Sequence, residues 1–224
     1  MAWAGGINHK NFSELHENLS DILDSLMGLA GFADSSVGQK AREDNQMIKD
    51  SIMIVSNEFP LKLADCTELT PFLIFKSMNR GIYGPGITWS LKSINADPQM
   101  EVYIVNNGGE ECMLGLLSLN KEYPFTCIFR ETLKEKINDW FVKQDVDFEE
   151  YKKFSDQFHM VSGDPSEIRS FLWNKPLDEL TAFPEMEAEI NRRHCLFRNS
   201  PKPVSREEAQ SFTLLAKKLM KILS

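Results

Sequence analysis

Residues 51–130 contain short β-rich runs that recur about every ten residues, and this spacing constrains the fold more than any other feature. Segments rich in Gly, Pro, Asn and Asp separate the runs, as expected where a chain turns between strands. The pattern is typical of an antiparallel sheet, sandwich or barrel. The runs read IMIVS, PLKLAD, PFLIFK, GITWSLK, EVYIV, CMLGLLSL and FTCIF.

Two of the separating segments predict turns. VNNGGEE, residues 105–111, is the strongest hairpin signal because Asn and Gly accept the positive φ angles of tight turns. NKEYP, residues 120–124, similarly predicts a break between the last two runs.

Helical patterns flank this β-rich region. Apolar residues recur at spacings of three and four over residues 12–29, and the polar segment 33–50 is either a second, solvated helix or a linker. Residues 205–223 are the clearest helix, with Ser205 as N-cap and Glu208 at N3 forming a capping box. Acidic residues in its first turn and lysines in its last turn both favour the helix dipole.

The segment between the β-rich region and the final helix mixes both patterns. Residues 133–141 and 148–154 have helical apolar faces, and residues 157–162 read as a strand. Residues 186–199, MEAEINRRHCLFRN, predict two strands around the polar tip NRR.

These elements predict an α+β protein. An N-terminal helix precedes a central antiparallel β-rich body, either a sandwich or a PH-like partial barrel, and a C-terminal α/β cap ends in the long amphipathic helix. We expect an N-terminal helical segment at 1–50 and a single domain at 51–224, which could divide near residue 144. One unit is favoured because no Pro-, Gly- or Ser-rich linker separates its halves.

Composition sets further limits. Of the 224 residues, 42% are hydrophobic and 26% are charged, which predicts a packed core. The net charge of −8 argues against nucleic-acid binding, which needs a basic surface to neutralise phosphates. The candidate basic patches are Arg192, Arg193, Arg198 and Lys202, or Lys217, Lys218 and Lys221.

The cysteines and the apolar stretches indicate a cytoplasmic protein. Cysteines 66, 112, 127 and 195 lie far apart in apolar runs without a CxxC pair, so we expect reduced, buried thiols and no metal site. No stretch reaches the roughly 18–20 apolar residues that span a bilayer, and the first residues lack the features of a signal peptide. We expect no cofactor.

The stretch GDPSEIRSFL, residues 163–172, holds the densest group of polar residues. Asp164 suits an N-cap, Pro165 suits N1 and Glu167 suits N3, so these residues have a structural role in starting a helix. A catalytic alternative would join His159, Ser162 and Asp164. Side chains three residues apart on a strand point to opposite faces, so this arrangement fails on geometry.

Four residues are the candidates for a binding site. Tyr83, in the glycine-rich loop RGIYGPG, and Trp89 could form the rim of a groove. His159 and Asp164 are the polar candidates. The glycine loop lacks the spacing of a phosphate cradle and precedes a strand.

Acidic residues concentrate at 185–189. Glu185, Glu187 and Glu189 would lie on one face of a strand, which is typical of the solvated side of an edge strand. A divalent ion could use them, although nothing in the sequence requires one.

Residues 154–180 carry a resemblance. The segment FSDQFHMVSGDPSEIRSFLWNKPLDEL, followed by a strand pair and a long capped helix, resembles the C-terminal part of uncharacterised bacterial domains of unknown function. Some members of that group carry membrane anchors upstream, and this sequence departs from them in having no visible anchor. The resemblance implies a bacterial scaffold or accessory protein and no particular activity.

Three functions are consistent with the sequence. The first is an accessory or binding protein that contacts a protein partner or a second copy of itself through a surface or groove. The second is a hydrolase whose site assembles from distant residues, for which Tyr83, His159, Asp164 and Glu187 would converge in one pocket. The third is a peripheral membrane domain that uses the 205–223 helix. This function ranks last, because the apolar stripe of that helix has the size expected of a stripe packed in a protein core. The sequence leaves enzymatic activity undecided.

Overall fold

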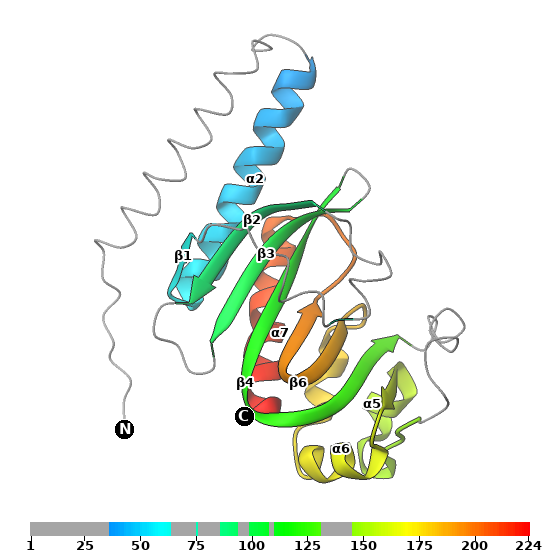
Figure 1. Cartoon of the computed structure of the whole chain (residues 1–224). Coiled ribbons are helices and arrows are strands. Elements are labelled where there is room, and N and C mark those ends of the chain that lie inside the picture. The colour runs from blue at the N-terminus through cyan, green and yellow to red at the C-terminus, as the bar shows by residue number, and fades with distance from the viewer. Residues whose placement is uncertain (1–35, 64–74, 76–85, 94–98, 108–109, 131–144) are drawn as a thin grey trace.

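The protein combines helices with one antiparallel sheet, which confirms the predicted α+β class (Figure 1). The sheet has six strands in the linear order β1-β2-β3-β4-β5, with β6 paired to β4, so it is open and not closed into a barrel. The computed structural model describes residues 36–63, 75, 86–93, 99–107, 110–130 and 145–224.

Five of the predicted runs of the β-rich region contribute to four strands. PLKLAD, GITWSLK and EVYIV contribute the first three, and the last two runs together form the fourth. The hairpin prediction is also confirmed, because Asn107 pairs with Glu110 across the predicted turn. The strands are β1 (Leu61–Leu63), β2 (Gly86–Ser93), β3 (Met100–Asn107), β4 (Glu110–Arg130), β5 (Phe158–Ser162) and β6 (Glu187–Arg198).

The long strand β4 organises the sheet. Its first part pairs with β3 and its last part with β5, from Thr126 to Arg130. The other edge of β4 pairs with β6, from Gly115 opposite Phe197 to Ile128 opposite Ala188. Three separate parts of the chain therefore meet on one strand.

The predicted break at NKEYP is absent, and the predicted reversal at NRR occurs within one continuous strand. β6 turns back at NRR, because Arg198 at its end contacts Glu187 at its start, but neither NKEYP nor NRR interrupts its strand. Instead, the register between the two strands shifts after Ser118 and again after Tyr123, and Arg192 has a φ of 54°. Polar, turn-favouring residues on both strands thus meet at one irregularity, which bends the ladder as a β-bulge does.

The run IMIVS is helical, which corrects the strand predicted there. It belongs to α2 (Ser36–Glu58), so the polar segment before it is part of a helix and not a linker. Ile48, Ile52 and Val55 are buried at spacings of four and three, which is the periodicity of one helix face. This periodicity extends across the run and outweighs the β-propensity of its branched side chains. α2 also continues through residue 50, where a boundary was expected.

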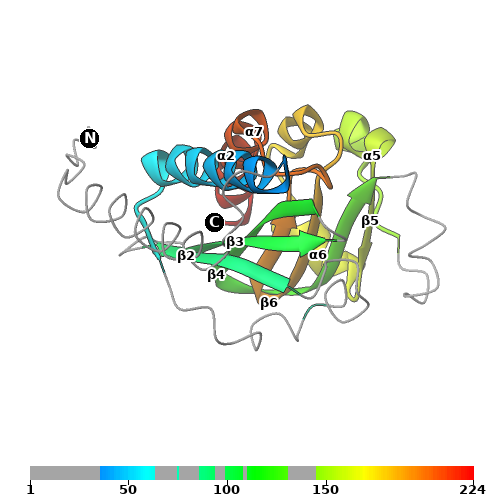
Figure 2. The same ribbon diagram turned by 90° about the horizontal axis from the view of Figure 1, so that it is seen from above.

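The helices α2 and α7 (Arg206–Leu223) cover one face of the sheet (Figure 2). They pack side by side and are joined by ion pairs from Arg206 to Asp50, at 3.6 Å, and from Lys217 to Glu58. The apolar stripe predicted for α7 is confirmed as core. Its buried members include Ala209, Phe212, Leu215, Ala216, Leu219 and Leu223.

A close contact fixes α7 on the sheet. The ring of Phe197 on β6 stacks on that of Phe212, with centroids 5.0 Å apart, and both side chains are fully buried. On β4, Gly115 lies opposite Phe197, and a Cβ atom there would overlap the ring. The glycine is therefore required by this close approach.

The other elements follow β4 in the chain. Helix α6 (Pro165–Leu172) starts as predicted, because the Asp164 side chain accepts hydrogen bonds from the backbone N–H groups of Ser166 and Glu167. After Pro176 the chain forms the 3₁₀ helix η5. The remaining short elements are η4 (Glu149–Tyr151), α5 (Lys152–Gln157) and η5 (Leu177–Ala182).

Some predictions lie outside the described residues. These are the helix at 12–29, the helix at 133–141, Cys66, and all of the run PFLIFK except Phe75. The other three cysteines, Cys112, Cys127 and Cys195, are buried.

Candidate functional site

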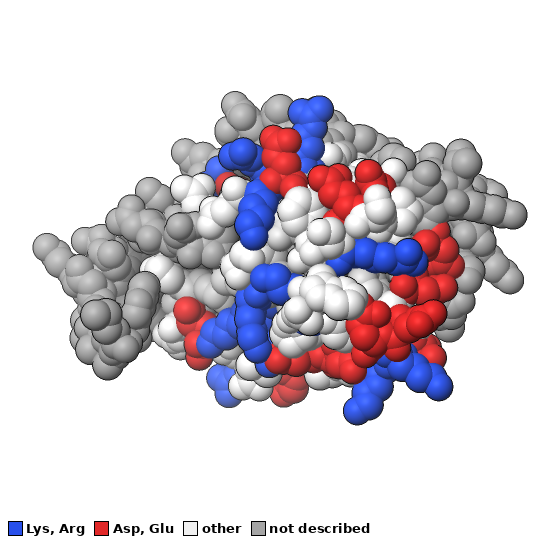
Figure 3. All heavy atoms as spheres, turned by 90° about the horizontal axis from the view of Figure 1, so that it is seen from below, with Lys and Arg blue, Asp and Glu red and all other residues white. Residues whose placement is uncertain are grey.

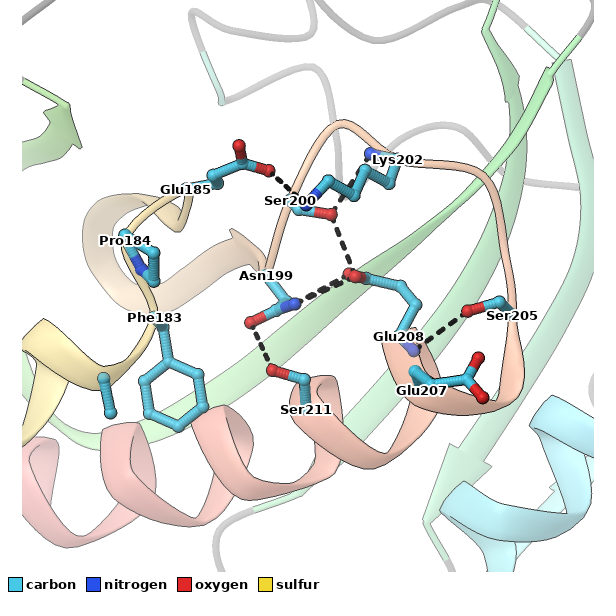
Figure 4. A pocket seen from close by; sticks show the side chains of 11 residues that line it. Phe183, Pro184, Glu185, Asn199, Ser200, Lys202, Ser205, Glu207, Glu208 and Ser211 are labelled. Carbon is cyan, nitrogen blue, oxygen red and sulfur yellow. Dashed lines mark hydrogen bonds and ion pairs between the residues drawn. The ribbon is translucent and has the colours of Figure 1, made fainter.

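A pocket of about 330 Å³ lies between the connection from η5 to β6 and the first turns of α7 (Figure 4). We call it the α7 pocket. Phe183 and Pro184 form one side, while Asn199 and Ser200, directly after β6, form another. Its volume lies within the range of about 300–1,000 Å³ that is usual for ligand sites.

Glu208 is the central polar residue of the α7 pocket. Its side chain accepts hydrogen bonds from Asn199 Nδ2, at 3.0 Å to each carboxylate oxygen, and from Ser200 Oγ at 2.9 Å. Ser211 Oγ in turn donates to Asn199 Oδ1 at 3.0 Å. Glu208 is 8% exposed, so the network orients a buried carboxylate at the wall of the pocket.

Glu208 is held in place by the cap at the start of α7. Ser205 caps the helix as predicted, accepting the backbone N–H of Glu208 at 3.1 Å. The other half of the capping box is wrong, because the Glu208 carboxylate turns to Asn199 and Ser200. These two residues follow the end of β6 and donate hydrogen bonds to the carboxylate.

The wall formed by residues 199–204 is tied to the sheet. The backbone N–H of Val204 donates to the carbonyl of Glu111 at 2.7 Å, and Cys112 Sγ donates to the carbonyl of Pro201 at 3.6 Å. Ser200 Oγ also accepts the backbone N–H of Lys202 at 3.1 Å. These bonds attach this wall to the start of β4.

Charge around the α7 pocket is unevenly compensated. Lys202 Nζ lies 3.1 Å from one oxygen of Glu185, and Arg130 Nη1 lies 3.6 Å from the other. Among the described residues, no Lys, Arg or His forms an ion pair with Glu208. The dipole at the start of α7 and neutral donors stabilise its charge instead.

Two of the residues predicted as binding candidates, His159 and Asp164, do not line the α7 pocket. His159, on β5, is buried at 5% exposure, with Nδ1 3.2 Å from Asp145 Oδ1 and its ring edge-on to Phe129. Asp164 caps α6. Trp89 lies on β2, and Tyr83 is outside the described residues.

Ser162 also has a structural role. Its hydroxyl accepts a hydrogen bond from Thr126 Oγ1 at 3.1 Å and interacts with the backbone of Phe125 and Asp164. These contacts join β5 to β4 next to the start of α6. They agree with the structural interpretation of this stretch.

The acidic face predicted for residues 185–189 is not a solvated edge. Glu189 is 4% exposed, and the Glu187 side chain is 13% exposed. Glu187 forms a two-pronged ion pair with the buried Arg198, at 3.0 Å from Nε and 2.8 Å from Nη2. The prediction is wrong because β6 presents this face to the interior.

The cap at Asp164 gives a pH-dependent prediction. Hydrogen bonds from the backbone of Glu167, and from the side chain and backbone of Ser166, lower the pKa of Asp164. A lowered pKa in the folded state stabilises the fold at pH values above the ordinary carboxyl pKa, and this contribution is lost as the pH falls through the folded value.

We therefore expect Asp164→Ala to lower the urea midpoint at pH 7 and to lower it less at pH 3. Asp164→Asn is the control, because asparagine caps helices without titrating in this range. Urea denaturation followed by circular dichroism measures both. An equal loss at the two pH values for Asp164→Ala would contradict the assignment.

Charged groups on the surface are mostly mixed in sign. On the face in Figure 3, Lys and Arg side chains lie among Asp and Glu side chains. Members of both predicted basic patches are ion-paired: Arg193 with Glu122, Lys202 with Glu185, Lys217 with Glu58, and Lys218 and Lys221 with Glu179.

The comparisons with known proteins give no family. The chain shows no significant match to a protein-family model, to a curated protein or to a solved structure. In the part of the chain that the structure describes, no helix is long and apolar enough to cross a membrane, and no three His, Cys, Asp or Glu residues are grouped as metal ligands.

Sequence reasoning missed the α7 pocket. Glu208 and Ser205 were interpreted only as a helix cap. The available signal was the placement of Asn199 and Ser200 directly after a strand, close in sequence to a helix whose first turns carry Glu208 and Ser211.

Proposed function

We propose that the protein is a cytoplasmic, non-catalytic binding protein that holds its ligand in the α7 pocket. The observation that carries the proposal is the buried, hydrogen-bonded carboxylate of Glu208 on the wall of a pocket of about 330 Å³. An apolar side formed by Phe183 and Pro184 beside a few fixed polar groups is typical of ligand sites. The buried free thiols of Cys112 and Cys195 support a reducing compartment.

Binding is favoured over catalysis by the chemistry of the lining. Among the described residues, no histidine lines the α7 pocket, and the serine hydroxyls that line it are held in structural bonds. Ser200 and Ser211 donate to Glu208 and Asn199, while Ser205 caps α7. A serine nucleophile needs a base that takes its proton beside an oxyanion site. The hydrolase alternative has no comparable support, because Glu187 is paired with Arg198 and His159 contacts Asp145.

Membrane binding through α7 is also less favoured. The apolar stripe of α7 is buried against the sheet and α2. Its C-terminal lysines, Lys218 and Lys221, are both paired with Glu179. The helix therefore lacks the free apolar face by which interfacial helices insert.

Native mass spectrometry of the protein purified from its own host tests the proposal. We expect a retained small molecule or partner that is lost in Ala182→Phe, because residue 182 is exposed at the pocket lining and a large side chain there would occupy the space. Glu207→Trp, on the α7 side of the pocket, is a second blocking variant.

Ser170→Phe is the matched control, since it adds the same bulk at an exposed position of α6 away from the pocket. A species retained equally by the wild type and both blocked variants would show that the pocket is not the binding site. Turnover of the retained species by the wild type would show that the protein is an enzyme.

A further inference from the structure

We infer that the α7 pocket binds a cationic group, an ammonium or a guanidinium, on an aliphatic stem. The inference rests on the proposed function and names the class of its ligand. Three features of the pocket lead to it: the buried Glu208 carboxylate, the charge of the surrounding residues, and the apolar side opposite.

The first feature is the state of Glu208. Burying a carboxylate is costly unless it is paired or well hydrogen-bonded. Its hydrogen-bond partners are one amide and one hydroxyl, from Asn199 and Ser200. An ionised carboxylate offers about four acceptor positions, so Glu208 has capacity left for a further donor.

The second feature is the negative charge of the residues that line the pocket. Its charged lining residues are Glu185, Glu207, Glu208 and Lys202. Lys202 and Arg130 compensate Glu185. Glu207 and Glu208 are then the charges that a ligand meets, and both repel phosphates and carboxylates. A cation is the ligand that completes the charge balance, and its interaction is strengthened by the partial burial of the site.

The third feature is the shape of the pocket. Phe183 and Pro184 lie across the pocket from the polar network (Figure 4). A stem of methylene groups could pack on this apolar side while its cationic end reaches Glu208. Lysine and arginine side chains combine both parts, and so do small free alkylamines.

The test uses the full chain, ¹⁵N-labelled, in NMR titrations with butylammonium and butylguanidinium. We expect both to shift the backbone amides of Ser205 to Glu208 and the side-chain amide of Asn199. N-butylacetamide, which has the same stem without the charge, should shift them little. Equal binding of this neutral analogue would overturn the inference.

Glu208→Gln removes the charge and keeps the size of the side chain. We expect it to weaken binding of both cations at least tenfold, since hydrogen bonds to charged groups are worth about 1.5–3 kcal/mol. The control is Glu122→Gln, an exposed residue paired with Arg193, which should bind as the wild type does. Unchanged affinity in Glu208→Gln would overturn the inference.

If Glu208→Gln fails to fold, Ala182→Phe serves as the second variant, because blocking the pocket should also abolish the shifts. The peptides Gly-Lys-Gly and Gly-Arg-Gly distinguish the sources. Tighter binding of a peptide than of the free cations supports a protein side chain as ligand, and the reverse supports a free amine.

The two proposals fail in different ways. If neither cation shifts these amides but the ligand retained from the host is still lost in Ala182→Phe, the binding site stands and the cationic assignment is wrong. If the retained ligand does not depend on the pocket, the proposed function is wrong whatever the cations do.

Discussion

Replacing Arg198 by methionine is expected to lower the free energy of unfolding by about 3–5 kcal/mol, because it removes one charge of a buried ion pair with Glu187. Both side chains are largely buried, at 8% and 13% exposure, and two hydrogen bonds join them. With a total stability of about 5–15 kcal/mol for a domain, this loss is a large fraction. Urea denaturation at pH 7 measures it.

The control is the double variant Arg198→Met with Glu187→Leu. Removing both charges of a buried pair costs far less than removing one, and it is sometimes stabilising. We therefore expect the double variant to regain much of the stability that the single variant loses. If the double variant instead lost as much stability as the two single variants combined, the interaction between Arg198 and Glu187 would not be the source of the loss.

Gly115→Ala has the second large effect, a loss of about 2–3 kcal/mol. The added Cβ would overlap the ring of Phe197, which is fully buried and stacked on Phe212. The ring cannot turn aside, since α7 lies directly behind it. Thermal and urea unfolding of the variant measure the loss.

Gly163→Ala is the matched control. A Cβ there would lie 3.7 Å from the carbonyl oxygen of Phe125, an ordinary contact. We expect a change within about 0.5 kcal/mol. Combining Gly115→Ala with Phe197→Leu should restore part of the loss, because the smaller side chain leaves room for the methyl group. Equal effects of the two glycine substitutions would contradict the packing argument.

Helix starts were predictable because their causes are local. Asp164 and Ser205 cap α6 and α7 through bonds to residues two or three positions away, and those spacings are visible in the sequence. The hairpin at residues 105–111 was predictable for the same reason, since the sequence signal of a tight turn is local.

Features that depend on distant partners were not predictable. NKEYP and NRR were each predicted as a turn from their own residues. In the structure they lie opposite each other on β4 and β6, and together they form one irregularity of the ladder. The interior position of Glu187 depends on Arg198, at the other end of the same strand. IMIVS was misread because its β-branched residues were weighed without the helical spacing that begins upstream.

The candidate site was out of reach for a related reason. Glu208 matches the capping-box pattern, and the pattern gives no sign that Asn199 and Ser200 compete for its carboxylate. A pocket also requires the placement of Phe183 and Pro184, which is set by η5 and the sheet together. Residue type alone could not bring these groups into one place.

The sharing of β4 among three partners has a consequence for how the chain folds. The hairpin with β3 closes early at little entropic cost, whereas β6 and α7 must return from far along the chain, as the bond from Tyr123 to Leu223 across 100 residues illustrates. Such high contact order predicts slow folding. β6 completes an edge of β4, and α7 covers its face. The backbone amides of β4 should therefore exchange with solvent only through global unfolding.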